Sequence, residues 1–387
     1  MIVMSLLSVV LFLYVLFSLI LPLRLPRGLR VAAALMLLAA AFKNTIFRWI
    51  SGGLFFAPDL PRWLLLTVSL LYNLLFVGAA LLLVKDAAWL LWKVFQRRAG
   101  LRPFPSRGAA WCVLVLSEVV SLWGMWEAVR VPDAVCHNVE PAGLSPAFDG
   151  LRVAVLTDLH ASAINRRPFV QELVERVNAL SPDVILLPGD LVDGPRTDRA
   201  WDLAPLAELR APLGVFGVSG NHEYYSGYDE WMDELKGLGV VMLENRHTTL
   251  TSGDGQLVVA GVPDEGRTRF GLPPADVAEA LEGAPTGATV LLMSHRPDTA
   301  PQAAGAGAAL QVSGHTHGGQ MPLLRQLVAR FNNGYVRGWY DVPSSPDASP
   351  MKLYVSSGAS QWNGLVMRLL TPPEIAVLTL HATPRDQ

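Results

Sequence analysis

The sequence predicts a chain of two unlike parts: a four-helix transmembrane region over residues 1–130, a linker over 131–147 and an α/β domain over 148–387. Hydropathy is the first observation behind this division. The 387 residues are 51% hydrophobic and 17% charged, with a mean hydropathy of +0.33, which is high for a soluble chain. Charge is the second observation. Residues 1–130 hold 13 Lys and Arg against 4 Asp and Glu, whereas the remainder holds 18 against 29.

Composition also excludes several classes of protein. A chain this apolar is not disordered, and it is neither collagen-like nor a disulfide scaffold. Its two cysteines, Cys112 and Cys136, are too few to frame a fold, and they leave the redox compartment open. The acidic balance of the second half disfavours a nucleic-acid partner, because no basic track is present to neutralise a phosphate backbone.

The first part contains four apolar runs of about the length that spans a bilayer. They cover residues 2–23, 29–49, 63–84 and 108–129. A signal peptide is a poor description of the first run, because no basic residue precedes it and no small-residue cleavage site follows it. Seven of the eleven tryptophans fall in this part, and most lie near the predicted span ends, as in an interfacial aromatic belt.

Basic residues predict the orientation of these spans, since short loops rich in Lys and Arg stay in the cytoplasm. Two predicted loops are basic, and their residues are Arg24, Arg27 and Arg30, followed by Lys85, Lys93, Arg97, Arg98, Arg102 and Arg107. With both loops in the cytoplasm, both termini lie on the other side. We therefore expect a multi-pass protein of the cell (inner or plasma) membrane, with its α/β domain outside the cytoplasm.

Three polar residues, Lys43, Asn73 and Glu118, fall inside predicted spans, where such groups are costly to bury. Two interpretations of Lys43 remain open. Its ammonium extends to the outer surface, or it pairs with Glu118 in a buried polar cluster.

The second part alternates short apolar runs with polar loops. The runs cover 151–156, 184–187, 215–218, 290–293 and 310–312. Continuous apolar runs of this length are typical of buried strands. Between the first two lies an amphipathic stretch over 168–180 that predicts a helix.

Side chains able to bind metals or transfer protons follow each of these five runs. They are Asp158, His160, Asp190, Asn221, His222, His295, His315 and His317. Because α/β sheets place ligands at the carboxyl ends of their strands, we expect these eight residues to form one site. His137, His247 and His381 follow no such run and are expected to be ordinary residues.

Five motifs occur here in order, and their residues are Asp158-Leu159-His160, Gly189-Asp190-Leu191-Val192-Asp193, Gly220-Asn221-His222-Glu223, Ser294-His295 and Gly314-His315-Thr316-His317. Together they resemble the five-block signature of calcineurin-like metallophosphoesterases, over roughly residues 148–381. Gly318-Gly319-Gln320 and the tail Pro372-Pro373-Glu374-Ile375 look like the bacterial, membrane-associated branch. The resemblance implies a four-layer α/β/β/α sandwich.

The same resemblance implies two divalent metal ions, which are manganese, iron or zinc. By the family pattern, Asp158, His160 and His317 hold one ion, Asn221, His295 and His315 hold the other, and Asp190 bridges them. Carboxylate, imidazole and carboxamide ligands suit such ions, and the lack of cysteine argues against a structural zinc site.

His222 resembles the family's non-ligand histidine, which implies proton donation to the leaving oxygen or charge stabilisation there. The alternative is a third ligand on the second metal. Asp193 and Glu223 flank the motifs, and two interpretations fit them equally well: they orient a ligating histidine, or they are solvated loop carboxylates.

The stretch over 321–341 supports two interpretations. It contains a helix packed on the domain, or an interfacial segment that admits a lipid substrate.

In total the sequence predicts a membrane-anchored dimetal phosphoesterase that hydrolyses a phosphodiester, phosphomonoester or pyrophosphate bond through a metal-activated hydroxide. Its expected partner is a phosphorylated substrate, with a phospholipid or lipid-linked molecule favoured by the four spans. The alternative is a catalytically silent, metal-binding membrane sensor or scaffold. The substrate, the native metals and the oligomeric state are left open.

Overall fold

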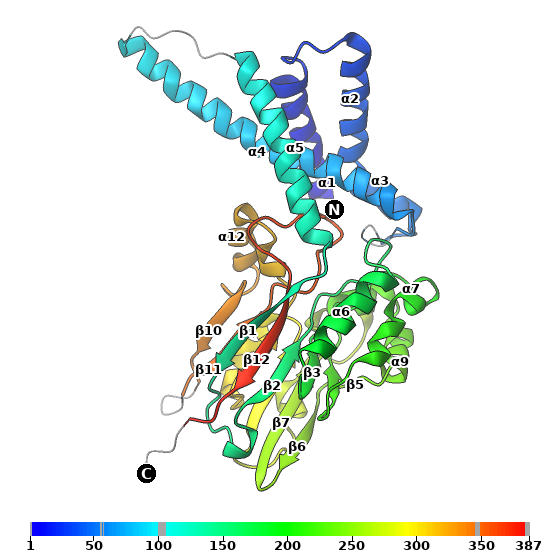
Figure 1. Cartoon of the computed structure of the whole chain (residues 1–387), viewed down its shortest axis with the longest axis vertical. Helices are drawn as coiled ribbons and strands as arrows, with labels where there is room; N and C mark the ends of the chain where they lie inside the picture. Colours follow the sequence, from blue (N-terminus) through cyan, green and yellow to red (C-terminus); the bar gives the residue numbers. More distant parts are fainter. Residues whose placement is uncertain (1, 55, 57, 100–105, 345–348, 384–387) are drawn as a thin grey trace. The chain divides into compact units, whose positions relative to one another are not determined.

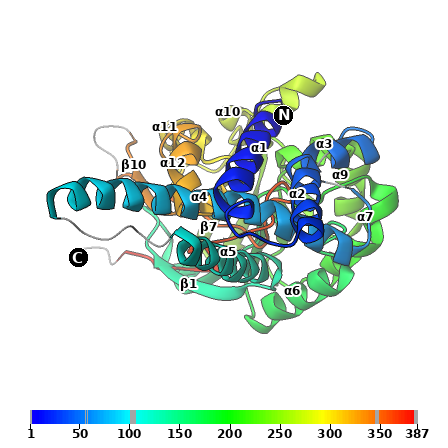
Figure 2. The same cartoon turned by 90° about the horizontal axis from the view of Figure 1, so that it is seen from above.

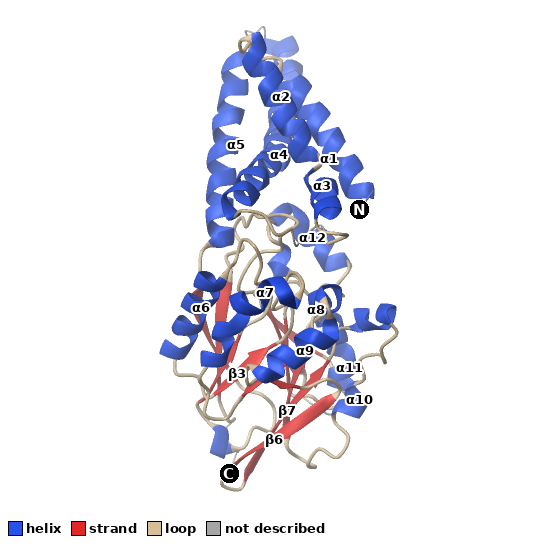
Figure 3. Ribbon diagram, turned by 90° about the vertical axis from the view of Figure 1, so that its right-hand side faces the viewer, coloured by secondary structure: helices blue, strands red, loops and turns tan. Residues whose placement is uncertain are grey.

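Two compact units make up the chain in the structure, a computed structural model (Figure 1). It describes residues 2–54, 56, 58–99, 106–344 and 349–383. The first unit comprises Met1–Glu127 together with Asn363–Met367, and the second comprises Ala128–Trp362 and Arg368–Gln387. Every strand in the described part belongs to the second unit (Figure 3).

The first unit is helical. Its elements are α1 (Ile2–Val15), the π-helical turn η1 (Leu16–Ile20), α2 (Arg27–Ala41), α3 (Lys43–Ile50), α4 (Arg62–Ala99) and α5 (Ser106–Val129). Helices α1 and α2 contact each other and α4, and Figure 2 shows them side by side.

Two described helical stretches are long and apolar enough to cross a membrane, 62–95 and 108–129. Helices α2 and α3 are bent by 58° at Phe42 and add a third if the pair forms one span. The apolar stretch Leu6–Ile20 is shorter. By length and composition the described residues thus support two spans, or three, where the sequence predicts four.

Helix α4 corrects the predicted loop between the third and fourth runs. Lys85 and Lys93 lie within the helix, which continues to Ala99. The residues after Val84 are mostly Ala, Leu, Lys and Arg, which favour helix, so the helix passes beyond its apolar run. Arg102 lies outside the described residues.

The position of Lys43 differs from both predictions made for it, extension to the outer surface and pairing with Glu118. Its side chain is buried, so it does not reach the surface. Its Nζ donates to the carbonyl oxygens of Gly364 at 2.9 Å and Asn363 at 3.5 Å rather than to the carboxylate of Glu118. An ammonium buried among apolar helices needs such oxygen partners.

The second unit contains two mixed six-stranded sheets. The first has the order β1 (Asp133–Val139), β12 (Glu374–Leu380), β2 (Leu151–Val155), β3 (Val184–Leu187), β4 (Val215–Gly217) and β5 (Val241–Met242). The second has the order β10 (Gly338–Val342), β11 (Met351–Val355), β9 (Leu310–Ser313), β8 (Thr289–Ser294), β7 (Gly255–Val262) and β6 (Arg246–Ser252). In each sheet four consecutive strands run parallel, β2 to β5 in the first and β11, β9, β8 and β7 in the second.

Both sheets contribute to one hydrophobic cluster. Val153 and Leu186 from the first sheet share it with Leu291 and Val312 from the second. The other face of the first sheet packs with α6 (Arg167–Ala179) and α9 (Tyr228–Gly237), and that of the second packs with α10 (Val277–Ala280) and α11 (Ala300–Gly305). Burial on both faces explains why the central strands are continuously apolar.

Strand β1 lies inside the predicted linker over 131–147 and corrects it. It pairs in parallel with β12 at the edge of the first sheet. Its side chains are mostly exposed or half-buried, so it lacks the apolar run that marks the central strands. Helix α6 lies where the amphipathic stretch predicts it.

Candidate metal centre

All eight predicted site residues come together in the second unit. They follow the carboxyl ends of β2, β3 and β4 in the first sheet and of β8 and β9 in the second. Because parallel strands end at a common edge, loops that are distant in sequence meet there. The site therefore draws on both sheets.

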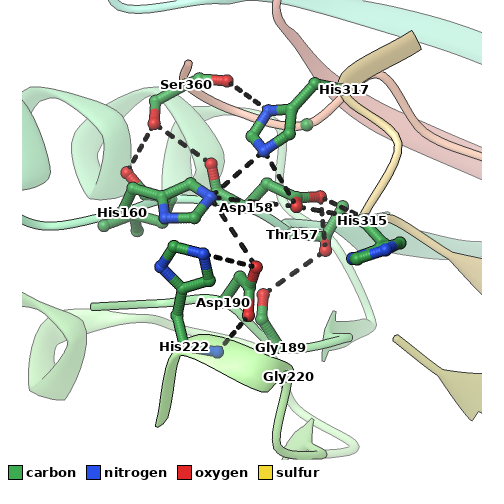
Figure 4. A network of polar contacts seen from close by, with 12 residues as sticks. Thr157, Asp158, His160, Gly189, Asp190, Gly220, His222, His315, His317 and Ser360 are labelled. Atoms are coloured by element: carbon green, nitrogen blue, oxygen red, sulfur yellow. Dashed lines mark hydrogen bonds and ion pairs between the residues drawn. The ribbon is translucent and has the colours of Figure 1, made fainter. Parts of the chain in front are cut away.

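Asp158, His160 and His317 form the first group of possible metal ligands (Figure 4). The Nε2 atoms of the two histidines lie 3.2 Å apart. Oδ1 of Asp158 lies 3.5 Å from Nε2 of His317 and 4.0 Å from Nε2 of His160. All three side chains are buried, and their ligand atoms all lie within 4.8 Å of one another.

Asp190, His295 and His315 form a second group. Oδ2 of Asp190 lies 3.2 Å from Nε2 of His295. The same oxygen lies 3.8 Å from Nε2 of His160, a member of the first group. Asp190 therefore stands between these two of the three groups of possible ligands that the described residues form, and the third comprises His160, Asp193 and His222.

Asn221 and the second group share a contact with Arg296, a residue that the sequence analysis missed. Arg296 donates from Nη2 to Oδ1 of Asn221 at 3.4 Å, and its Nη1 lies 3.0 Å from Nε2 of His315. Its Nε donates to Asp264 at 2.6 Å. The guanidinium thus contacts two predicted ligands. Its place directly after His295 was the one signal in the sequence.

Backbone conformation sets the direction of the ligand side chains. Five of the eight site residues have positive φ, and these are Asp158, His160, Asp190, His315 and His317. Residues other than glycine rarely adopt this conformation, and where they do they cluster at functional sites. Each turn directs its side chain inward just after a strand ends.

Asp193 connects two histidines of the site. Its Oδ1 lies 3.1 Å from Nδ1 of His160 and 2.5 Å from Nδ1 of His222. Burial raises the pKa of Asp193, but the two histidines outweigh it and lower that pKa to about 2. Burial lowers the pKa of His222, but Asp190 and Asp193 raise it to about 9. The structure therefore favours the orienting role for Asp193.

Glu223 is buried and holds two loops together. Its carboxylate accepts hydrogen bonds from the backbone N–H groups of Asp190 at 3.0 Å, Leu191 at 2.6 Å and Gly220 at 2.7 Å. Burial and the nearby Asp190 raise its pKa to about 7. It is a positioning residue and not a solvated carboxylate.

Ser360 and Arg368 lie beside His317, and the sequence analysis missed both. The Ser360 carbonyl lies 3.1 Å from Nδ1 of His317. Arg368 is fully buried, with Nη1 donating to the His317 carbonyl at 3.5 Å and Nη2 lying 3.2 Å from Nδ1. Sequence patterns do not mark an arginine for burial, so no signal pointed to it.

The three remaining histidines lie away from this centre. His137 contacts Tyr354 and Trp339, His247 lies 2.8 Å from the Ala280 carbonyl, and His381 contacts Asn138.

The donor atoms fit a pair of divalent ions. Nε2 of His295 is buried and lies 3.2 Å from Oδ2 of Asp190, so its close polar neighbour is itself a candidate ligand. Burial and Arg296 lower the pKa of His315 well below its usual range, and burial and His160 do the same for His317. Both imidazoles are therefore neutral, which leaves a nitrogen lone pair on each ring for a metal.

Comparison with known proteins identifies the family. The family model for calcineurin-like phosphoesterases matches residues 151–319. A metallophosphoesterase of Campylobacter jejuni is 33% identical over 269 residues, which cover 69% of this chain and 68% of the relative. The chain belongs to the calcineurin-like metallophosphoesterase family. It is by class a metal-dependent phosphoric ester hydrolase, as the sequence predicts.

Two further relatives extend the similarity. A Helicobacter pylori metallophosphoesterase is 35% identical, covering 76% of this chain and 74% of the relative. A Bos taurus protein described as a transmembrane protein with a metallophosphoesterase domain is 33% identical, covering 74% of this chain and 64% of that one. Such transmembrane relatives and the apolar helices of the first unit indicate membrane association.

Proposed function

We propose that the chain is a membrane-anchored dimetal phosphoesterase that hydrolyses a phosphodiester, phosphomonoester or pyrophosphate bond. One observation carries this proposal. Oδ2 of Asp190 lies 3.2 Å from Nε2 of His295 and 3.8 Å from Nε2 of His160, so a single carboxylate serves two groups of ligands.

Each group would hold one ion, which is manganese, iron or zinc. In this proposal Asp158, His160 and His317 hold the first ion, Asn221, His295 and His315 hold the second, and Asp190 is shared. The convergence of Asp158, His160 and His317, and of Asp190, His295 and His315, supports this assignment. Two bound ions supply a hydroxide at neutral pH and neutralise phosphate oxygens. Arg296 is 26% exposed at its side chain and can donate to a phosphate oxygen entering this site.

His222 is the proposed proton donor to the leaving oxygen. Its raised pKa favours the protonated ring, and bound cations would lower that pKa towards neutrality. We expect a His222→Ala protein to keep both metals and to lose turnover by about 10²–10⁴-fold. Loss of one metal in this variant would instead identify His222 as a ligand.

A direct assay tests the whole proposal. The full chain is solubilised in detergent, loaded with Mn²⁺ and given bis(p-nitrophenyl) phosphate and p-nitrophenyl phosphate, with metal content measured in parallel. We expect two ions per chain and hydrolysis that Asp190→Asn abolishes. Two bound ions without hydrolysis under any divalent metal would favour the silent sensor or scaffold.

We further propose four spans in the cell membrane, a second unit outside the cytoplasm and an α/β/β/α layering of its sheets and helices. Helix α1 with η1 supplies the additional span in this proposal. Cys136 is exposed on β1, which allows a test in a Cys112→Ser background. A membrane-impermeant maleimide should label Cys136 in intact bacterial cells. A cysteine replacing Gly28 should react only after lysis, and the reverse pattern would contradict this orientation.

An amphiphilic substrate is the finer part of the proposal. Helix α12 (Pro322–Arg330), just after the ligand His317, has no buried residue among those described. Leu323 is 74% exposed, Leu327 55% and Phe331 73%, which is more apolar surface than a helix packed on a soluble domain leaves. Exposed Arg325 and Arg330 suit anionic headgroups. These exposures favour the interfacial interpretation.

Vesicles distinguish the two kinds of substrate. A Leu323→Ser, Phe331→Ser protein should lose activity on a lipid phosphate in anionic vesicles while keeping activity on a soluble aryl phosphodiester. Trp201→Ser, which removes an equally exposed aromatic residue on α7 (Arg196–Leu203), is the matched control. Equal losses on both substrates would contradict an interfacial role.

A further inference from the structure

A short segment of the chain leaves the unit that contains the metal centre. Residues Asn363–Met367 belong to the helical unit, while Trp362 before them and Arg368 after them belong to the second. All five residues of the segment are buried. A segment that only connected two strands would run over the surface instead.

Two polar side chains of the helical unit hold this segment, and we name Lys43 and Asn73 the anchor pair. Nζ of Lys43 donates to the Gly364 carbonyl at 2.9 Å, and Nδ2 of Asn73 donates to the Val366 carbonyl at 2.8 Å. Both side chains are buried. Lys43 also lies over the Tyr72 ring, 4.6 Å from its centroid.

The anchor pair and its partners lie far apart in the sequence. Gly364 follows Lys43 by 321 residues, and Val366 follows Asn73 by 293. Polar groups inside apolar helices are costly, and they persist where they have a specific partner. Here the partners are backbone carbonyls that no neighbouring helix supplies. The anchor pair is therefore built for this segment.

The two ends of the segment lead directly to the metal centre. On one side, Ser360 N–H donates to the Asp158 carbonyl at 3.0 Å, and its carbonyl meets the His317 ring. On the other side, the Arg368 guanidinium contacts the carbonyls of His317 and Ser357. Leu369 N–H donates to the Gln320 carbonyl at 2.9 Å.

We propose that Lys43 and Asn73 are positioning residues for the metal centre: by holding Asn363–Met367 within the helical unit, they fix Ser360 and Arg368 around His317. The function served rests on the proposed metallophosphoesterase activity. Coupling runs through the covalent chain and the hydrogen bonds described above.

Amide hydrogen exchange and metal binding test this role without turnover. The full chain in detergent is compared with Lys43→Met, Lys43→Gln and Asn73→Ala, and Lys93→Met serves as control because Lys93 is exposed on α4, the helix of Asn73. The readouts are exchange at Ser360 and Leu369, exchange in β8 as an internal reference, and Mn²⁺ affinity.

Loss of a hydrogen bond to a charged donor should raise exchange at Ser360 and Leu369 by about tenfold or more in Lys43→Met. Mn²⁺ affinity should fall by about 10–100-fold, as when support of a ligating histidine is lost. Lys43→Gln should be intermediate because its amide still donates. Exchange in β8 and the whole Lys93→Met protein should match the wild type.

Wild-type exchange and affinity in folded Lys43→Met and Asn73→Ala proteins would overturn the proposal. If Lys43→Met does not yield monodisperse protein, Asn73→Ala and Lys43→Gln decide the question by the same criteria. A wild type that binds Mn²⁺ without hydrolysis refutes the proposed function alone. The exchange and affinity differences still decide the role of the anchor pair.

Discussion

Nδ1 of His222 lies 2.5 Å from Oδ1 of Asp193, and both side chains are buried. The same oxygen contacts Nδ1 of His160 at 3.1 Å. One carboxylate therefore fixes the ring orientation of a proposed metal ligand and of the proposed proton donor, leaving Nε2 of each ring to face the centre.

Replacing Asp193 by Asn should impair catalysis and metal binding together. The amide oxygen of Asn could still accept from both N–H groups, but it lacks the negative charge that strengthens these hydrogen bonds and favours protonated His222. We expect a loss of about 10–100-fold in both kcat and Mn²⁺ affinity, measured by steady-state kinetics and calorimetric titration. Asp198→Asn, on the exposed face of α7, should behave as wild type. Unchanged kcat and Mn²⁺ affinity in Asp193→Asn would show that the charge of Asp193 beside His160 and His222 does not contribute to function.

Replacing Glu223 by Gln should destabilise the second unit. Three backbone N–H groups converge on this carboxylate, and the NH₂ group of glutamine would face donors. The expected loss is about 1–3 kcal/mol in the free energy of unfolding, measured by denaturant titration of detergent-solubilised protein. Glu230→Gln, at an exposed position of α9, is the matched control. Equal stability of both variants would be inconsistent with a positioning role.

Gly220 allows two loops of the site to approach closely. A Cβ at this position would overlap the backbone and side chain of Asp190. Gly220→Ala should therefore lower the stability by about 1–3 kcal/mol and reduce kcat by displacing the shared carboxylate. Gly237→Ala, where a Cβ meets no atom within 4 Å, provides the comparison in thermal unfolding and activity assays. A fully active Gly220→Ala protein would contradict the close approach.

Metal removal should lower the thermal stability of the protein. An ion present at a hundred times its dissociation constant stabilises the folded state by about 2.7 kcal/mol, which corresponds to a shift of about 5–10 °C in Tm for a unit of this size. Differential scanning fluorimetry with EDTA, followed by Mn²⁺ addition, measures this change. Asp190→Asn should show a much smaller response. A wild-type Tm that is insensitive to EDTA would argue against resident ions.

Most of the candidate site could be predicted from the sequence because each proposed ligand lies within a few residues of a strand end. His315 and His317, for example, follow an apolar run directly, and the turn that aims them is local. Arg368 and the partners of Lys43 could not be found this way, since their contacts join residues far apart in the chain. Strand β1 was missed for a related reason. An edge strand with exposed side chains carries no apolar run, and only its pairing with β12 defines it.

Helix α12 shows a different kind of limit. The spacing of Leu323, Leu327 and Phe331 predicts one apolar face, but periodicity cannot say whether that face meets protein or lipid. The length of α4 was underestimated because hydropathy marks the apolar part of a helix and not its end.

The excursion of Asn363–Met367 also bears on how this enzyme could be produced in soluble form. A shortened chain that begins near Ala128 would retain the proposed metal ligands and every described strand. It would also expose Leu365, Val366 and Met367, all buried in the full chain, as an adjacent apolar patch on a loop. Such a fragment would be prone to aggregate through that loop. Polar replacements at these three positions are the changes that a water-soluble version would need.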